Sequence, residues 1–218
     1  FDLQSRNLTV LAGNKVQGYM DGVFTKALFD DPYGIVADEK GDLLIADGKY
    51  VRKMDLETKT IHKLTGTSTV YSILSIEIRS KDPLGQPCSQ TLFERAVCLA
   101  LDKEQRIYVA DSHACRIRMI EGKYVKLFAG SRPGFVDGNL DQAKFFEPRA
   151  ILFEDDRFML LADKNGLRRI DMKLRTVSTP NEYQHIQYPW CLAKDKDGNV
   201  YVGTDGYIFK LEDTWKYE

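Results

Sequence analysis

Three aspartates recur at the end of an apolar run in three similar stretches of the chain. Asp47 follows "LLIA", Asp111 follows "IYVA" and Asp163 follows "MLLA", while Thr204 stands at the corresponding place in a fourth stretch. Carboxylates gathered on one face of a fold can bind a cation or a basic peptide. Alternatively, each aspartate caps the turn that follows it by accepting backbone hydrogen bonds. Because the residue recurs with the repeat, as a structural element does, we favour the capping role.

Arginines recur in step with these aspartates. Arg52, Arg118 and Arg168 lie at matching positions a few residues further on, and Lys210 is a neighbour in phase in the fourth stretch. Together they could form a basic stripe that binds phosphate. A periodic arginine more often buries its stem and pairs with a carboxylate of a neighbouring repeat unit, and we expect this structural role.

The histidines give no indication of a catalytic centre. A catalytic zinc site needs three convergent protein ligands and one open position. His62, His113 and His185 fall in an outer strand, a turn and a connection between repeat units, so we do not expect them to converge. No Ser–His–Asp or Cys–His order follows from the spacing either. The sequence therefore predicts a non-enzymatic protein with no catalytic residue, no cofactor and no metal site.

The four cysteines are widely spaced and form no CxxC pair. This spacing argues against a zinc or thioredoxin-like motif and favours free thiols. Cys98 and Cys191 hold equivalent positions in the repeat, where we expect two core cysteines in matching sockets, although a contact between them across a central channel is the alternative. The full set is Cys88, Cys98, Cys115 and Cys191.

Composition excludes several classes of protein. The 218 residues carry a formal net charge of −1, so no global field favours nucleic acid or an anionic membrane. No apolar run approaches the roughly 20 residues that a membrane helix needs, so we expect no membrane insertion. Because the chain starts at Phe1, we expect a processed chain or a fragment, and its compartment stays open.

Four similar segments predict the fold. Each reads as an apolar strand, an acidic turn, a second apolar strand and a half-exposed third strand that alternates basic and apolar residues. Gly41 and Gly198, in the first turns, suit a positive φ. A fourth strand follows in at least two units, as "TIHKLTG" from Thr60 and "YVKLFAG" from Tyr124. The segments are "GIVADEKGDLLIADGKYVRKMD", "CLALDKEQRIYVADSHACRIRMI", "ILFEDDRFMLLADKNGLRRID" and "CLAKDKDGNVYVGTDGYIFKLE".

This pattern indicates an all-β fold, a β-propeller built of four-stranded antiparallel blades. Residues 1–218 form one domain, with blades at about 33–65, 96–130, 149–179 and 190–218 and an extended insert at 66–95. Residues 1–13 read as an outer strand without inner strands of its own. Either this strand completes the last blade and closes a four-bladed ring, or the four blades are part of a larger propeller.

The connections between blades carry a second repeat. The stretches "VLAGNKVQGYMDGVFTKALFDDP" from Val10 and "LFAGSRPGFVDGNLDQAKFFEP" from Leu127 share Ala-Gly, Asp-Gly, Ala-x-Phe and Pro. On these motifs, nearly the whole chain resembles the NHL-repeat family of β-propellers. The Asn-His-Leu positions that name the family are poorly kept, since the second unit has Ala114-Cys115-Arg116-Ile117 there. The resemblance implies a propeller of five or six blades, and some members of the family bind RNA.

We expect the chain to bind another protein through the face that carries the inter-blade connections and the turns after the second strands. Trp190, which has no counterpart in the other units, is the best aromatic candidate for a contact. Alternatives are an RNA-binding propeller, a structural subunit of a larger assembly and, last, a metal-dependent lyase- or lactonase-like enzyme; an unclosed ring would also favour oligomerisation. The candidate contact residues are Asp111, Ser112, His113, Trp190, Arg79 and Lys81.

Overall fold

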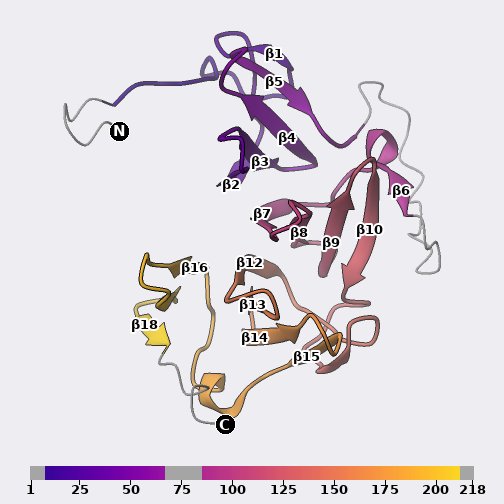
Figure 1. Ribbon diagram of the computed structural model, residues 1–218, viewed down its shortest axis with the longest axis vertical. Helices are drawn as coiled ribbons and strands as arrows, with labels where there is room; N and C mark the ends of the chain where they lie inside the picture. Colours follow the sequence, from indigo (N-terminus) through magenta and orange to yellow (C-terminus); the bar gives the residue numbers. More distant parts are fainter. Residues whose placement is uncertain (1–7, 67–84, 212–218) are drawn as a thin grey trace.

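The computed structural model describes residues 8–66 and 85–211, and in these residues the predicted all-β propeller arrangement is present. Four antiparallel sheets follow one another around a common axis, in chain order (Figure 1). The only helical elements in the described ranges are two short 3-10 turns, η1 (Cys88–Gln90) and η2 (Asn181–Tyr183). The candidate contacts Arg79 and Lys81, and most of the expected insert, lie outside the described residues.

Strand order is the same in the first three sheets, which we call sheets 1 to 3. Sheet 1 contains β2 (Pro32–Ala37), β3 (Leu43–Asp47), β4 (Tyr50–Asp55) and β5 (Thr60–Lys63), with β1 (Gly22–Val23) on the outer edge. Sheet 2 contains β7 (Ala96–Leu101), β8 (Ile107–Asp111), β9 (Arg116–Glu121) and β10 (Tyr124–Ala129), with β6 (Gln86–Pro87) outside. Sheet 3 contains β12 (Pro148–Phe153), β13 (Phe158–Asp163), β14 (Gly166–Asp171) and β15 (Thr176–Ser178), with β11 (Gly138–Asn139) outside.

Sheet 4 has three strands among the described residues: β16 (Cys191–Lys194), β17 (Val200–Gly203) and β18 (Ile208–Leu211). The two-residue outer strands of sheets 1 to 3 were not predicted. In sheets 1 and 3 they come from the long connection that precedes the sheet, so that connection is part of the blade that it leads into.

Local sequence explains the strands and their turns. The inner and second strands are short apolar runs, and β8 and most of β13 are fully buried, as expected for strands covered on both faces. In the turns after the first strands, Gly41 and Gly198 have φ of 86° and 87°, which confirms the expected positive φ. Gln105 takes a φ of 60° at the same place in sheet 2.

The third strands of sheets 1 to 3 depart from expectation, whereas β18 of sheet 4 alternates exposed and half-buried residues as predicted. Their alternation of basic and apolar residues predicted a half-exposed strand, but β14 is buried along its whole length and β4 along much of it. Arg52 and Arg168 have no exposed surface. The prediction failed because the preceding connection covers the arginine side of the strand and supplies it with polar partners, which strand periodicity does not reveal.

Neighbouring sheets pack face to face. The inner strands β2, β7, β12 and β16 lie next to one another in that order, and separate apolar clusters fill the spaces between sheets 1 and 2, 2 and 3, and 3 and 4. Sheets 1 and 2 approach so closely at Gly34 that an added Cβ would lie 2.7 Å from the carbonyl oxygen of Val97. Glycine is required there by the contact between two backbones.

The four sheets form an open arc (Figure 1), and no strand pairing joins sheet 4 to sheet 1 among the described residues. Residues 8–13, the described part of the expected outer strand, contain no strand, and Leu8 and Val10 are exposed. Ile35 on sheet 1 is 63% exposed and Ile208 on sheet 4 is 80% exposed. Apolar faces left open at both ends of the arc support the second alternative, in which these sheets are part of a larger propeller.

Candidate functional site

The site predicted from sequence lies on one face of the arc, which we call the carboxylate face. It carries the turns after the second strands, at 48–49, 112–115, 164–165 and 204–207. It also carries the residues just before and at the start of the first strands, at 30–33, 94–97, 146–149 and 188–190. Asp47, Asp111 and Asp163 end β3, β8 and β13 on this face, and all three are buried.

Each aspartate fixes the chain that leads into its sheet. One carboxylate oxygen of Asp47 accepts hydrogen bonds from the backbone N–H groups of Asp30 and Asp31, at 3.0 and 2.8 Å. Asp111 accepts the N–H groups of Glu94 and Arg95 in the same way, and Asp163 accepts that of Phe146. The structural role is therefore as expected in kind, but the target is the segment about 16 residues earlier, not the following turn.

The recurring arginines hold the second carboxylate oxygen and the connection. Arg52 donates to Asp47 at 3.0 Å and forms a second ion pair with Asp21 of the connection at 2.8 Å. Arg168 pairs with Asp137, the equivalent of Asp21, at 2.5 Å, and its Nη1 lies 3.6 Å from Asp163. The expected partner in a neighbouring repeat unit was wrong, because the carboxylates come from the arginine's own sheet and from the connection that leads into it.

Burial makes the ionisation of these groups costly. It raises the pKa of Asp163 to about 7, against the opposing effect of the Phe146 N–H and of Arg168. Burial also raises the pKa of Asp111 and lowers the pKa of Arg118, whose nearest nitrogen is 3.7 Å from the Asp111 carboxylate. These carboxylates are enclosed and engaged by backbone donors, so their geometry suits a structural role and not a cation-binding ring.

Exposed on the carboxylate face is a cluster around Tyr33. The guanidinium of Arg95 lies over the Tyr33 ring, 4.6 Å from its centroid, and donates to the Tyr33 hydroxyl. Its other terminal nitrogen contacts His113 Nε2 at 3.3 Å, and Arg95 also pairs with Asp31 at 3.4 Å. The cluster joins sheets 1 and 2, and Tyr33 remains 53% exposed.

A second cluster surrounds Trp190 and joins sheets 3 and 4. The guanidinium of Arg149 lies 3.5 Å from the centroid of the Trp190 ring, whose indole N–H donates to Asp205. Glu147 lies 3.9 Å from Arg149 and 2.9 Å from Lys164. Trp190 is 52% exposed, so one face of its ring stays open to solvent.

The strand register places Tyr33 and Trp190 at the same position of the repeat. Each directly precedes the residue that pairs with the small residue before the repeat position of Asp47 and Thr204: Gly34 pairs with Ala46, and Cys191 pairs with Gly203. Trp190 therefore has a counterpart, contrary to the sequence analysis. The two were not matched because the connection before the fourth segment is short and shares little with the others.

The structure separates the predicted contact residues into two groups. His113 and Trp190 are exposed on the carboxylate face, whereas Asp111 and Ser112 are buried and hold the backbone. Arg95 and Arg149, which cover the two aromatic rings, were not named from sequence. Their signal was the similar stretches "ERA" and "PRA", which mark an arginine at the start of the first strand in sheets 2 and 3.

The described residues of this face form no cluster of metal ligands and no pair of thiols. Within residues 8–66 and 85–211, no group of three His, Cys, Asp or Glu side chains is placed to hold a metal ion. The four cysteines are free thiols, and Cys191 is exposed at the end of the arc while its equivalent Cys98 packs against Ile151 of sheet 3. In the same ranges, no helix has the length and apolar character needed to cross a membrane.

Comparison with known proteins supports the fold. Residues 185–206 match the model of the two component regulator propeller family. The chain is 25% identical over 172 residues to Protein SUPPRESSOR OF QUENCHING 1, chloroplastic, from Arabidopsis thaliana. That alignment covers 75% of this chain and 16% of the relative.

Solved structures of similar fold include proteins of different function. A streptogramin B lyase superposes with a TM-score of 0.53 at 13% identity, covering 84% of this chain and 52% of the lyase. A virginiamycin B lyase from Staphylococcus aureus, solved with quinupristin, gives 0.52 at 14% identity over 90% and 60%. The extracellular domain assigned to a hybrid two-component system of Bacteroides thetaiotaomicron gives 0.56 at 13% identity over 85% and 24%.

These likenesses establish the fold alone, because identity is low and the same fold occurs in enzymes and in other proteins. The chain also spans only part of each relative: about a sixth of the plant protein and about a quarter to three fifths of the three structures. The chain is thus a β-propeller arrangement of four sheets, similar to parts of larger propellers.

Proposed function

We propose that this chain is a non-enzymatic, NHL-type interaction module that binds another protein through the carboxylate face. The observation that carries the proposal is the pair of half-exposed aromatic rings, Tyr33 and Trp190, each covered on one side by an arginine. Aromatic and arginine side chains that are held in place but open on one side are the residues that contribute most to protein–protein contacts. Because Arg95 and Arg149 fix the rings, little side-chain entropy is lost on binding.

The connections support the NHL-type assignment by giving its motif a physical role. Ala27 and Ala143, of the two Ala-x-Phe motifs, have no exposed surface. Asp21 and Asp137, of the two Asp-Gly motifs, form the ion pairs with the buried arginines described above. The shared series is thus a set of contacts that fasten each connection to its sheet.

Charge on the face favours protein over RNA. Single-stranded RNA is bound by aromatic rings set in a positively charged groove. Here each exposed aromatic–arginine pair has a carboxylate beside it: Asp31 next to Arg95, and Glu147 and Asp205 next to Arg149 and Trp190. A mixed surface of this kind matches the polar rim of a protein interface.

Affinity capture with the whole chain as bait tests the proposal. The bait variants are Trp190→Ala and Arg95→Ala on the carboxylate face, with Tyr124→Ala as matched control. Tyr124 is an exposed aromatic residue at the start of β10, at the opposite end of the sheet. A protein partner should be retained by the wild type and by the control, and its Kd should rise at least tenfold for each of the other two variants.

Other outcomes would replace the proposal. If the captured partner binds all four baits equally, the carboxylate face is not the contact surface. If RNA is captured instead, and its binding weakens steeply between 50 and 200 mM salt, about as expected for phosphate contacts, the chain is an RNA-binding propeller.

A further inference from the structure

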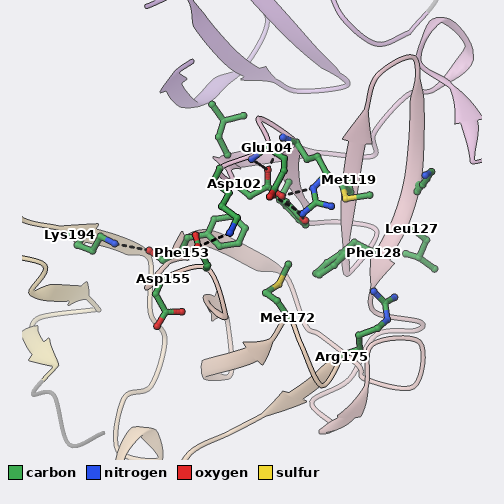
Figure 2. A pocket seen from close by; sticks show the side chains of 16 residues that line it. Asp102, Glu104, Met119, Leu127, Phe128, Phe153, Asp155, Met172, Arg175 and Lys194 are labelled. Atoms are coloured by element: carbon green, nitrogen blue, oxygen red, sulfur yellow. Dashed lines mark hydrogen bonds and ion pairs between the residues drawn. The ribbon is translucent and has the colours of Figure 1, made fainter. Parts of the chain in front are cut away.

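A cavity of about 520 Å³ lies between sheets 2 and 3, on the face of the arc opposite the carboxylate face (Figure 2). Its side chains come from β7 to β10 and the first turn of sheet 2, from β12 and two turns of sheet 3 and, through Lys194, from β16 of sheet 4. Its size falls within the range of sites that take small molecules, roughly 300–1,000 Å³. It is separate from the clusters on which the proposed function rests.

The floor of the cavity is apolar and rich in aromatic rings. Tyr108 stands edge-on to Phe128, with ring centroids 4.9 Å apart, and to Phe153, at 5.3 Å. Met119 of sheet 2 and Met172 of sheet 3 line the same space, and Figure 2 shows Met172 between Phe128 and Asp155. Flexible thioethers beside aromatic rings make a surface that adapts to a flat apolar group.

The equivalent position in sheets 1 and 3 holds a side chain that is engaged in ion pairs within its own sheet. At the position of Met119, sheet 1 has Lys53 and sheet 3 has Arg169, as the strand registers show. Lys53 pairs with Asp38 at 3.0 Å and with Asp42 at 2.8 Å. Arg169 pairs with Glu154 at 3.0 Å and lies over the Phe158 ring.

Sheet 2 therefore departs from its neighbours at one position. Sheets 1 and 3 place a long cation, held by carboxylates of the first turn, on the side that faces the next sheet. Sheet 2 has a methionine there, and its turn carboxylate, Asp102, binds Arg106 and the Tyr108 hydroxyl instead. With the cation absent and its carboxylate engaged elsewhere, the cavity opens onto an apolar floor.

Charges on the rim differ in how far they are already paired. Lys103 forms an ion pair with Asp156 across the two sheets, and Lys126 with Glu121. The guanidinium of Arg175, in the turn before β15, has no hydrogen bond or ion pair to any described residue. Figure 2 shows it beside Phe128 and Leu127. An arginine with free donors at the edge of an aromatic floor is suited to bind a carboxylate in a bidentate manner.

We propose that this cavity is a binding site for a small aromatic carboxylate, whose ring lies on the floor between Met119 and Met172 and whose carboxylate meets Arg175. The ring displaces water from the aromatic and thioether surface, and the arginine sets the orientation. The site is independent of the carboxylate face, so variants of Trp190 and Arg95 leave it unchanged.

Methyl NMR with 1-naphthoate as probe tests the site directly. The chain has five methionines, and methyl-¹³C labelling gives each its own signal. The signals of Met119 and Met172 should shift saturably with 1-naphthoate, while that of Met54, which is buried in the separate apolar cluster of sheet 1, serves as internal control and stays in place. The Met119 signal is identified by its loss in Met119→Lys.

Two variants separate the contributions of floor and rim. Arg175→Gln should lower the affinity for 1-naphthoate at least tenfold and leave the affinity for the neutral analogue 1-naphthalenemethanol unchanged. Met119→Lys, which restores the cation that sheet 1 carries, should fill the cavity and abolish the shift of Met172. The Met54 signal at its wild-type position, with the dispersed methyl spectrum of a folded protein, reports that each variant is folded.

Three results would overturn the proposal. They are the absence of any shift at millimolar probe, shifts of similar size at all five methionines, and binding by Met119→Lys at wild-type affinity. If Arg175→Gln weakens the acid and the alcohol equally, or weakens neither, the carboxylate contact is wrong.

Discussion

Sheets 3 and 4 share one repeat and one register but differ in what surrounds them. Leu167, the second residue of β14, has no exposed surface, whereas Ile208, at the same position of the repeat in β18, is 80% exposed. The ion pair of sheet 3 is also missing from sheet 4, where Thr204 stands in place of Asp163 and Phe209 in place of Arg168. Both members of the pair change together.

This difference shows that burial in a propeller is supplied by the neighbour. Leu167 is covered because sheet 4 and its connection pack against it. Ile208 has the same chemistry and no described neighbour on that side. The joint replacement of aspartate and arginine follows from the same physics, since either charge alone would be buried without a partner.

The largest expected effect comes from breaking the charged pair of sheet 3. Arg168→Ala leaves the Asp163 carboxylate enclosed without its cation and removes a side chain with no exposed surface. Loss of one partner of a buried pair costs roughly 3–5 kcal/mol of the free energy of unfolding. Urea unfolding followed by circular dichroism measures this loss.

The residues that sheet 4 carries at these two positions, a threonine and a phenylalanine, provide the control. The double variant Asp163→Thr with Arg168→Phe removes both charges together and should be destabilised less than Arg168→Ala alone. A double variant that is the less stable of the two would show that the pair is required for more than charge balance.

Truncation of Leu167, the residue of sheet 3 that corresponds to Ile208 of sheet 4, should have the next largest effect on the free energy of unfolding. Leu167→Ala removes a fully buried side chain between sheets 3 and 4, and such changes cost roughly 2–5 kcal/mol. The free energy of unfolding from urea titration is the measurement. A loss below about 1 kcal/mol would mean that sheet 4 does not pack on sheet 3 as the structure shows.

Sequence and structure agree on the parts of the molecule that local pattern controls. The apolar runs, the acidic turns and Gly41 identified the four sheets, because strand alternation and turn chemistry are short-range properties. What the sequence did not reveal are contacts between segments far apart in the chain. The aspartates were assigned to the following turn, although their donors lie about 16 residues earlier.

The same limit applies to the candidate site. Ser112 was selected for its place in an exposed-looking turn, but it is buried where its N–H donates to the Arg95 carbonyl. The Arg149–Trp190 stack joins two sheets. The unusual residue at the position of Met119 is recognised only when the registers of three sheets are compared. None of these could be read from one segment alone.

An effect of intermediate size is expected from pH, because sheet 3 has the buried Asp163 where sheet 4 has a threonine. Burial raises the pKa of Asp163 to about 7, well above its value of about 4 in the unfolded chain. The folded state then binds more protons than the unfolded state between these values. The contribution of Asp163 to the free energy of unfolding is therefore fully present below about pH 4. It is lost as pH rises through 7, by at most about 1.4 kcal/mol per pH unit.

Asp163→Asn removes this titration, so its free energy of unfolding should fall less between pH 4 and 7 than that of the wild type. Thermal unfolding across that range, with both proteins in the same buffers, isolates the difference. Parallel profiles would mean that Arg168 keeps the Asp163 carboxylate ionised in spite of its burial.

The smallest effect is expected at the exposed counterpart in sheet 4. Ile208→Ser changes a residue that is 80% exposed, and substitutions at such positions usually alter the free energy of unfolding by no more than about 0.5 kcal/mol. The same apolar face is a surface on which copies can associate, so the variant should show a lower apparent mass by light scattering at high concentration if association occurs through it. Urea unfolding and light scattering on the same samples separate the two effects. A destabilisation close to that of Leu167→Ala would mean that Ile208 is covered in solution, and the contrast between sheets 3 and 4 would then lie in the charged pair alone.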